Sequence, residues 1–125
     1  MKPKVQEVEE NAGAEPGDGG LVITGIRISV QFGRGLKKLK GKYPDEAKDR
    51  IRQLLFLKVS EAPAKLHLHP LSSKTVASML DPNKKIKVYT FHISADDKYK
   101  ASFTIENGEA YLRVCGEHDW IDKNP

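Results

Sequence analysis

Histidine side chains are the residues of this chain best suited to proton transfer, because imidazole titrates near neutral pH. The 125-residue sequence contains four of them, His67, His69, His92 and His118. A positioned histidine can act as the general acid or the general base that cleavage of RNA through its 2′-hydroxyl requires. A metal would compete for the same side chains, and His67 and His69 share one face if their segment is a strand. The sequence places no further histidine, cysteine or acidic cluster beside this pair, so we predict neither a metal nor another cofactor; an ordinary surface role is the alternative for each histidine.

Cations and hydroxyl groups are expected on one face of a C-terminal β-hairpin. The Asn107-Gly108 pair is typical of a two-residue type I′ turn, and such a turn determines which residues lie opposite each other. One face of the hairpin is then apolar and carries Ala101, Phe103 and Ile105 opposite Val114, Leu112 and Ala110. The other face carries Lys100, Ser102 and Thr104 opposite Cys115, Arg113 and Tyr111, with Lys98 opposite Glu117.

The polar face of this hairpin is predicted to bind RNA. Its cations suit phosphates, and Tyr111, Arg113 or the nearby Trp120 can stack on bases. The net charge of the chain is +4, and the part after residue 20 is the basic part, because acidic residues outnumber basic ones before it. This charge favours nucleic acid, although an acidic protein segment, an anionic membrane surface or a plain solvated surface also fits it. The candidate RNA-binding residues are Lys87, Lys98, Ser102, Tyr111, Arg113 and Trp120.

Two helices and four strands are expected to position these residues. Apolar residues alternate with polar ones over 26–32, which predicts a strand with one buried face. Leu36 and Leu39 suggest a short lysine-rich helix, and a longer helix is predicted from Pro44 to just before Ala62-Pro63. Another strand is predicted over 86–93, and the hairpin supplies two more. The predicted core residues are Ile28, Val30, Phe32, Ile51, Leu54, Leu55, Val88, Phe103, Ile105, Leu112 and Val114.

The predicted fold class is α+β, with a mainly antiparallel, twisted four-stranded sheet and two N-terminal helices packed on its apolar face. Residues 21–125 are expected to form this domain. Residues 1–20 are rich in glycine and poor in large apolar side chains, which predicts a flexible, disordered tail. The sequence has no apolar run of the roughly 20 residues that cross a bilayer and no signal peptide, so we expect a soluble, cytoplasmic protein without a membrane partner.

Several other classes of protein are excluded by motifs that the sequence lacks. Cys115 is the only cysteine, so neither an intrachain disulfide nor a cysteine-based zinc fold is possible. The sequence contains no Walker loop, dinucleotide fingerprint or GxSxG nucleophile motif. We interpret Gly33-Arg34-Gly35 as a turn, because this stretch is too short to surround a phosphate.

The order of the elements and four stretches of sequence resemble the RelE/ParE superfamily of toxins from bacterial type II toxin–antitoxin systems, including its HigB-like branch. The stretches are 32–40, 66–71, 98–103 and 116–125, and the resemblance covers about residues 26–125. Ribonuclease members of this family cleave mRNA in the ribosomal A site without a metal. The resemblance implies that Lys100 stabilises the scissile phosphate and that His118 and His69 supply the acid and the base, in either order. Asp122 stands where many relatives have a tyrosine.

The resemblance therefore implies an endoribonuclease that cleaves mRNA and so inhibits translation. The expected partners are a cognate antitoxin protein and mRNA on the ribosome. ParE-like members of the family instead bind and inhibit DNA gyrase and lack such a catalytic set. A gyrase-binding toxin, or an inactive relative that binds RNA or protein, is therefore the alternative.

Overall fold

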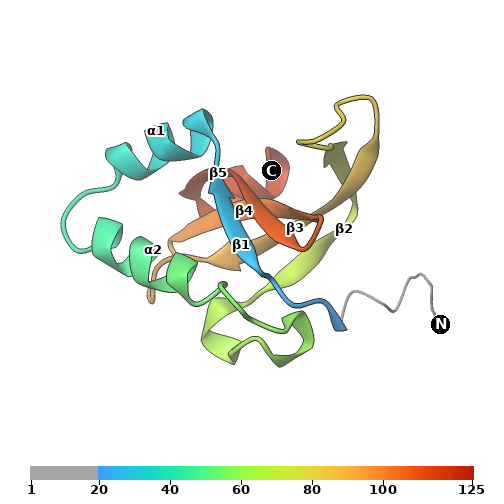
Figure 1. Ribbon diagram of the computed structural model, residues 1–125. Helices are drawn as coiled ribbons and strands as arrows, with labels where there is room; N and C mark the ends of the chain where they lie inside the picture. The colour runs from blue at the N-terminus through green and yellow to red at the C-terminus, as the bar shows by residue number, and fades with distance from the viewer. Residues whose placement is uncertain (1–19) are drawn as a thin grey trace.

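A mixed five-stranded sheet forms the centre of the computed structural model, which describes residues 20–125 (Figure 1). The spatial order of the strands is β1-β5-β4-β3-β2. β1 runs parallel to β5, and the other neighbouring pairs are antiparallel. The strands are β1 (Gly25–Ile28), β2 (His69–Ala77), β3 (Lys85–His92), β4 (Tyr99–Glu106) and β5 (Glu109–Glu117).

The predicted α+β class is confirmed, but the predicted arrangement of four antiparallel strands and two helices is wrong. The unpredicted strand is β2, a mostly exposed edge strand whose sequence lacks a clear apolar alternation. The unpredicted helix is α3 (His118–Lys123), which follows β5 directly. The predicted tail lies outside the described residues, except for Gly20. Over residues 20–125, no helix has the length and apolar character needed to span a membrane.

The first strand ends four residues earlier than predicted, because Ser29 caps the following helix. Its hydroxyl accepts a hydrogen bond from the backbone N–H of Phe32 at 3.0 Å and donates one to the carbonyl of Arg113 at 2.9 Å. Helix α1 (Val30–Lys38) therefore begins inside the predicted strand. Ile28 and Val30, which we predicted to be buried, are 55% and 74% exposed. Phe32 is buried, but it belongs to the helix.

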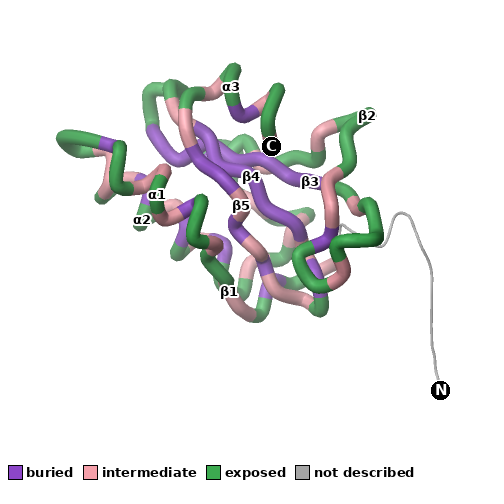
Figure 2. The backbone as a smooth tube through the Cα atoms, turned by 90° about the horizontal axis from the view of Figure 1, so that it is seen from above, coloured by how far each residue is buried: buried purple, intermediate pink, exposed green. Residues whose placement is uncertain are grey.

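The helices cover the two faces of the sheet unequally. Helix α2 (Tyr43–Arg52) has Pro44 in its first turn as predicted, but it ends at Arg52, and two 3-10 turns (Val59–Glu61 and Ala64–Leu66) lead on to β2. Figure 2 shows α1 and α2 on one side of the buried sheet and α3 on the other. Helices therefore cover part of both faces, whereas the predicted fold had helices on the apolar face only.

The hairpin of β4 and β5 confirms the predicted turn and half of the predicted register. Asn107 and Gly108 both have positive φ angles, of 53° and 77°, as a type I′ turn requires. The predicted pairs hold from the turn to Phe103 opposite Leu112. A bulge then shifts the register by one residue, so that Ser102 lies opposite Val114, Ala101 opposite Cys115 and Lys100 opposite Gly116. The predicted partners of Lys100, Ala101 and Ser102 are therefore wrong.

The bulge brings Cys115 onto the apolar face, where α1 packs closely against β5. Cys115 belongs to the core, and burial raises the pKa of its thiol to about 12. An added Cβ at Gly35 would lie only 2.8 Å from the Cys115 sulfur, so this glycine allows the close approach of the helix. Of the other predicted core residues, Leu55 is 42% exposed and Ile105 is half-buried. The remaining predicted core residues are buried: Phe32, Ile51, Leu54, Val88, Phe103, Leu112 and Val114.

Candidate functional site

Three histidine rings lie together at one end of the sheet, and we call His67, His92 and His118 the histidine cluster. The rings of His67 and His92 are stacked, with centroids 4.2 Å apart. The ring of His118 meets that of His92 edge to face, with centroids 5.0 Å apart. The fold thus assembles three of the four histidines from three separate parts of the chain.

Each histidine of the cluster stands at the boundary of an element. His92 is the last residue of β3, and His118 is the first residue of α3. The backbone N–H of His118 also donates a hydrogen bond to the carbonyl of Lys98 at 2.9 Å, which ties the start of α3 to the loop residue just before β4. His67 follows the second 3-10 turn and has a φ of 47°, so the chain turns sharply there before β2 begins.

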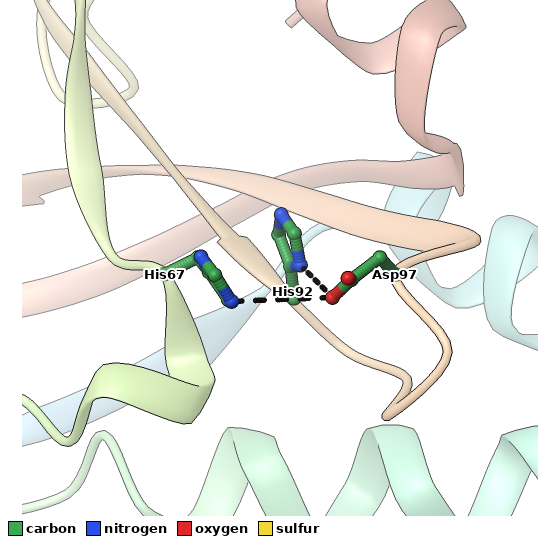
Figure 3. A group of neighbouring side chains, drawn as sticks. All are labelled: His67, His92 and Asp97. Atoms are coloured by element: carbon green, nitrogen blue, oxygen red, sulfur yellow. Dashed lines mark hydrogen bonds and ion pairs between the residues drawn. The ribbon is translucent and has the colours of Figure 1, made fainter.

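Asp97, in the loop between β3 and β4, joins two of these rings (Figure 3). Its Oδ1 lies 2.8 Å from Nδ1 of His92 and 4.0 Å from Nε2 of His67. The hydrogen bond from His92 lowers the pKa of the Asp97 carboxyl. Burial lowers the pKa of His92, and the bond to Asp97 only partly opposes this effect. The pair is therefore a neutral imidazole that donates its Nδ1–H to an ionised carboxylate.

A second carboxylate, that of Asp122, joins His118 to a buried lysine. Oδ2 of Asp122 lies 3.5 Å from Nδ1 of His118, whose Nδ1 is also 3.2 Å from Oδ1 of Asp119. The ammonium group of Lys100 donates to the other Asp122 oxygen at 2.5 Å. Because the Lys100 side chain is only 2% exposed, this ion pair holds Asp122 in one place against His118.

The cluster borders a shallow surface hollow. Two of its histidines reach this hollow, and the surrounding charges are mixed. Lys98 contributes an exposed cation, whereas Asp97, Glu117 and Asp119 contribute carboxylates. The lining residues are His92, Asp97, Lys98, Glu117, His118 and Asp119.

The structure brings two of the three predicted catalytic residues together and leaves the third outside. His118 and Lys100 are joined through Asp122. His69 is exposed on β2, opposite Thr90, and its Nδ1 lies 3.1 Å from the carbonyl of Pro70. The histidine of this segment that enters the cluster is instead His67, because the sharp turn at that residue directs it toward His92.

The predicted exposed cationic face of the hairpin is wrong. Lys100, Ser102 and Thr104 are 2% exposed or less, so that row of side chains is interior. Within residues 20–125, the buried hydroxyls of Ser102 and Thr90 have no hydrogen-bond partner, and the predicted contact of Ser102 with RNA does not fit this burial. Helix α3, which the sequence analysis missed, covers part of this face through the contact of Asp122 with Lys100.

Arg113, another predicted RNA-binding residue, is engaged within the protein. Its guanidinium donates to the carbonyls of Ala77 at 3.1 Å and Pro125 at 3.3 Å. Burial lowers the pKa of this half-buried group. Arg113 therefore connects β5 to the end of β2 and to the last residue of the chain.

The other predicted RNA-binding residues keep some exposure. Tyr111 is half-buried, Lys87 and Lys98 are exposed, and Trp120 is 48% exposed. Trp120 lines a second groove with Arg34 and Lys38 of α1. Contact of these side chains with RNA stays a prediction.

The sequence analysis missed Asp97, named Asp122 only as a departure from the family pattern, and did not choose His67 or His92 as catalytic residues. Side-chain alternation along the strands carried one signal for His92. His92 pairs with Lys100, and paired residues lie on the same face of a sheet. The statement that no acidic cluster lies beside His67 considered only its neighbours along the chain. In space it is wrong, because Asp97 lies 4.0 Å from this ring. Two groups have the side-chain types of metal sites, His67 with His92 and Asp97, and His118 with Asp119 and Asp122.

No family model, curated protein or solved structure matches this chain.

The loop that carries Asp97 is tied to α2 by Tyr43, whose hydroxyl donates to Asp96 at 2.6 Å. This bond raises the pKa of Tyr43 to about 12 and lowers that of Asp96 to about 2. Protonated Tyr43 stabilises the fold below pH 10, and this stabilisation is lost as pH rises from 10 toward 12. Ionised Asp96 stabilises the fold above pH 3.8, and this second contribution to stability is lost as pH falls toward 2.

We therefore expect Tyr43→Phe to lower the free energy of unfolding most between pH 3.8 and pH 10. The difference from the wild type should shrink on both sides of this window. On the acid side the difference should begin to shrink only below pH 3.8, because Ser94 and the backbone N–H of Lys98 still donate to Asp96 in the variant and keep its pKa low. Urea unfolding at a series of pH values measures this, and a difference that stays constant across pH 10 would contradict it.

Proposed function

We propose that this chain is an RNA-cleaving toxin of a toxin–antitoxin pair, a metal-independent endoribonuclease of the RelE/ParE kind. The observation that carries the proposal is the pair His92 and His118 in one hollow, each with its Nδ1 beside a carboxylate. Two imidazoles oriented in this way are the groups that acid–base cleavage of RNA needs. The order of the elements, a strand, two helices, antiparallel strands and a C-terminal histidine, supports the same proposal.

The reaction needs a base that takes the proton of the 2′-hydroxyl and an acid that protonates the departing 5′-oxygen. The 2′-oxygen attacks phosphorus, and the P–O5′ bond breaks as the P–O2′ bond forms. The products are a 2′,3′-cyclic phosphate and a 5′-hydroxyl. Because the carboxylates engage Nδ1 of His92 and His118, the Nε2 atoms are the ones available to exchange these protons.

The two nearby lysines have different roles in this proposal. Lys98 is exposed at the hollow, where its ammonium group can stabilise the charge that develops on the phosphorane. Lys100 is buried against Asp122, so it acts as a positioning residue for His118 rather than as a ligand of the phosphate. This differs from the role that the sequence resemblance implies for Lys100.

A toxin that binds gyrase without catalysis is the second candidate. The observation that favours it is the presence of Asp97, Glu117 and Asp119 around the hollow, because three carboxylates oppose the approach of a phosphodiester. In this case the mixed charges would contact a protein surface. An antitoxin partner is expected with either candidate.

The two candidates are separated by adding the purified protein to a translation reaction and to a gyrase supercoiling reaction. The protein is first treated with EDTA and desalted. We expect a reporter mRNA to be cleaved, with 2′,3′-cyclic phosphate and 5′-hydroxyl ends mapped by primer extension, while DNA of the same sequence stays intact. Intact mRNA together with inhibited supercoiling would favour the gyrase-binding candidate, and no effect in either reaction would contradict both.

A further inference from the structure

We propose that His67, His92 and Asp97 form a binding site for a divalent transition-metal ion such as Zn²⁺, and that the bound ion inhibits RNA cleavage. The metal-binding part stands on the geometry of these three residues alone. The inhibitory part rests on the proposed function, in which His92 exchanges a proton with the substrate. The ion is thus a regulator of the site and takes no part in the reaction itself.

The three candidate ligand groups lie next to one another (Figure 3). One ring nitrogen of His67, one of His92 and a carboxylate oxygen of Asp97 lie within 4.8 Å of one another. Zn²⁺ binds such atoms at about 2.0–2.2 Å in a tetrahedron, which separates neighbouring ligand atoms by about 3.4 Å. The two separations from Asp97 Oδ1, 2.8 Å to His92 and 4.0 Å to His67, lie on either side of this value. Because the two rings are stacked, one of them must turn before both nitrogens can face the ion, and the exposed side chain of His67 has room to do so.

The ligand types select the class of ion. Two imidazole nitrogens and one carboxylate oxygen suit Zn²⁺, Co²⁺ and Ni²⁺ better than Mg²⁺ or Ca²⁺, which prefer oxygen ligands. His92 supplies a buried ligand held by its strand, whereas the side chains of His67 and Asp97 are 52% and 62% exposed. The exposed pair gives the ion a path from solvent and leaves its fourth position open to water.

The second group, His118 with Asp119 and Asp122, is a poorer site. One oxygen of Asp122 already accepts from the Lys100 ammonium, so a metal ion there would lie close to a buried positive charge. Asp119 has a side chain that is 95% exposed and would have to be immobilised. Near the Asp97 group, the guanidinium of Arg50 donates to the backbone carbonyl of His92 at 3.4 Å. The Asp97 group therefore carries the proposal.

The ion would act on the reaction through the protons of His92. Asp97 accepts a hydrogen bond from Nδ1–H of His92, and when the ion binds Nδ1 the proton of this nitrogen moves to Nε2. The neutral ring then carries its proton on Nε2 and can no longer act as a base. Because His118 is not a ligand in this arrangement, the loss of activity comes from His92 alone.

The test measures metal binding and RNA cleavage separately on the full chain. Co²⁺ absorption spectra and Zn²⁺ calorimetry report binding to the EDTA-treated protein whether or not it cleaves RNA. His67→Ala and Asp97→Asn are expected to weaken binding by at least about tenfold. His69→Ala is the matched control, since this exposed histidine is two residues from His67 but lies outside the cluster. Circular dichroism checks that each variant is folded.

Zn²⁺ should inhibit cleavage by the wild type and by His69→Ala at concentrations near its dissociation constant. Cleavage by His67→Ala is compared with its own rate without Zn²⁺, since this ring also packs on His92, and its remaining cleavage should resist inhibition. Equal metal affinity of His67→Ala and His69→Ala would overturn the metal site. Tight binding at the site without inhibition of an active enzyme would overturn the regulatory part, and tight binding to a protein that cleaves no RNA would keep the site and reject the proposed function.

Discussion

His118→Ala is expected to lower the rate of RNA cleavage by a factor of about 10²–10⁴, the usual contribution of a general acid or base. His118 lies at the hollow with its Nδ1 beside Asp119 and Asp122, and it is the histidine that joins the hollow to α3. Its side chain is 34% exposed, so its removal leaves little cavity in the core. The rate is measured by primer extension of a reporter mRNA over time. Growth arrest on induction in a bacterial host should disappear in parallel.

The matched control for this variant is again His69→Ala. His69 was predicted as a catalytic residue from the sequence, but the structure places it on the exposed edge strand β2. Its substitution should leave the cleavage rate within about twofold of the wild type, as for a surface residue that touches no reacting group. If His69→Ala abolished cleavage while His118→Ala did not, the assignment of the site to the histidine cluster would be wrong.

Asp122→Asn is expected to lower the free energy of unfolding by about 3 kcal/mol, because it leaves the charge of Lys100 buried without a partner. The Lys100 side chain is 2% exposed, and its ammonium group donates to Asp122. We expect the lower end of the usual range for such a change, since Asp122 itself is 35% exposed. Urea unfolding at neutral pH measures the loss.

Lys100→Met, alone and together with Asp122→Asn, shows whether the buried charge causes this loss. The double variant should be more stable than Asp122→Asn, because methionine removes the charge and keeps most of the side-chain volume. The two effects should therefore be strongly non-additive. A double variant that loses the full sum of the single effects would show that the pair does not interact, and would remove the basis for Lys100 as a positioning residue.

The hairpin shows how far local rules reached in this fold. Because the turn type follows from Asn107-Gly108, the pairing near the turn followed from the sequence. The bulge four residues further on did not follow from the sequence. The shifted register places Cys115 against α1, and this is a contact between distant parts of the chain. The burial of Lys100 also went unpredicted, because alternation along a strand shows which residues share a face but not whether a helix covers it.

The start of α1 shows a conflict between two local signals. Ile26, Ile28, Val30 and Phe32 alternate as in a strand, yet Ser29 is a strong N-cap residue in the middle of this run. The cap prevailed because its hydroxyl also reaches the carbonyl of Arg113, a contact that exists only once β5 is in place. Local pattern alone could not decide between the two.

The sequence by itself determined the α+β class, the type I′ turn, the start of α2 and part of the core, because these depend on residues that are neighbours along the chain. The tertiary structure alone decided the candidate site. His67, His118 and the pair of His92 with Asp97 come from three separate segments, and no spacing along the chain records that the three segments meet. Their contact depends on strand pairing and on two sharp turns, which bring distant residues together by long-range packing rather than by local propensity.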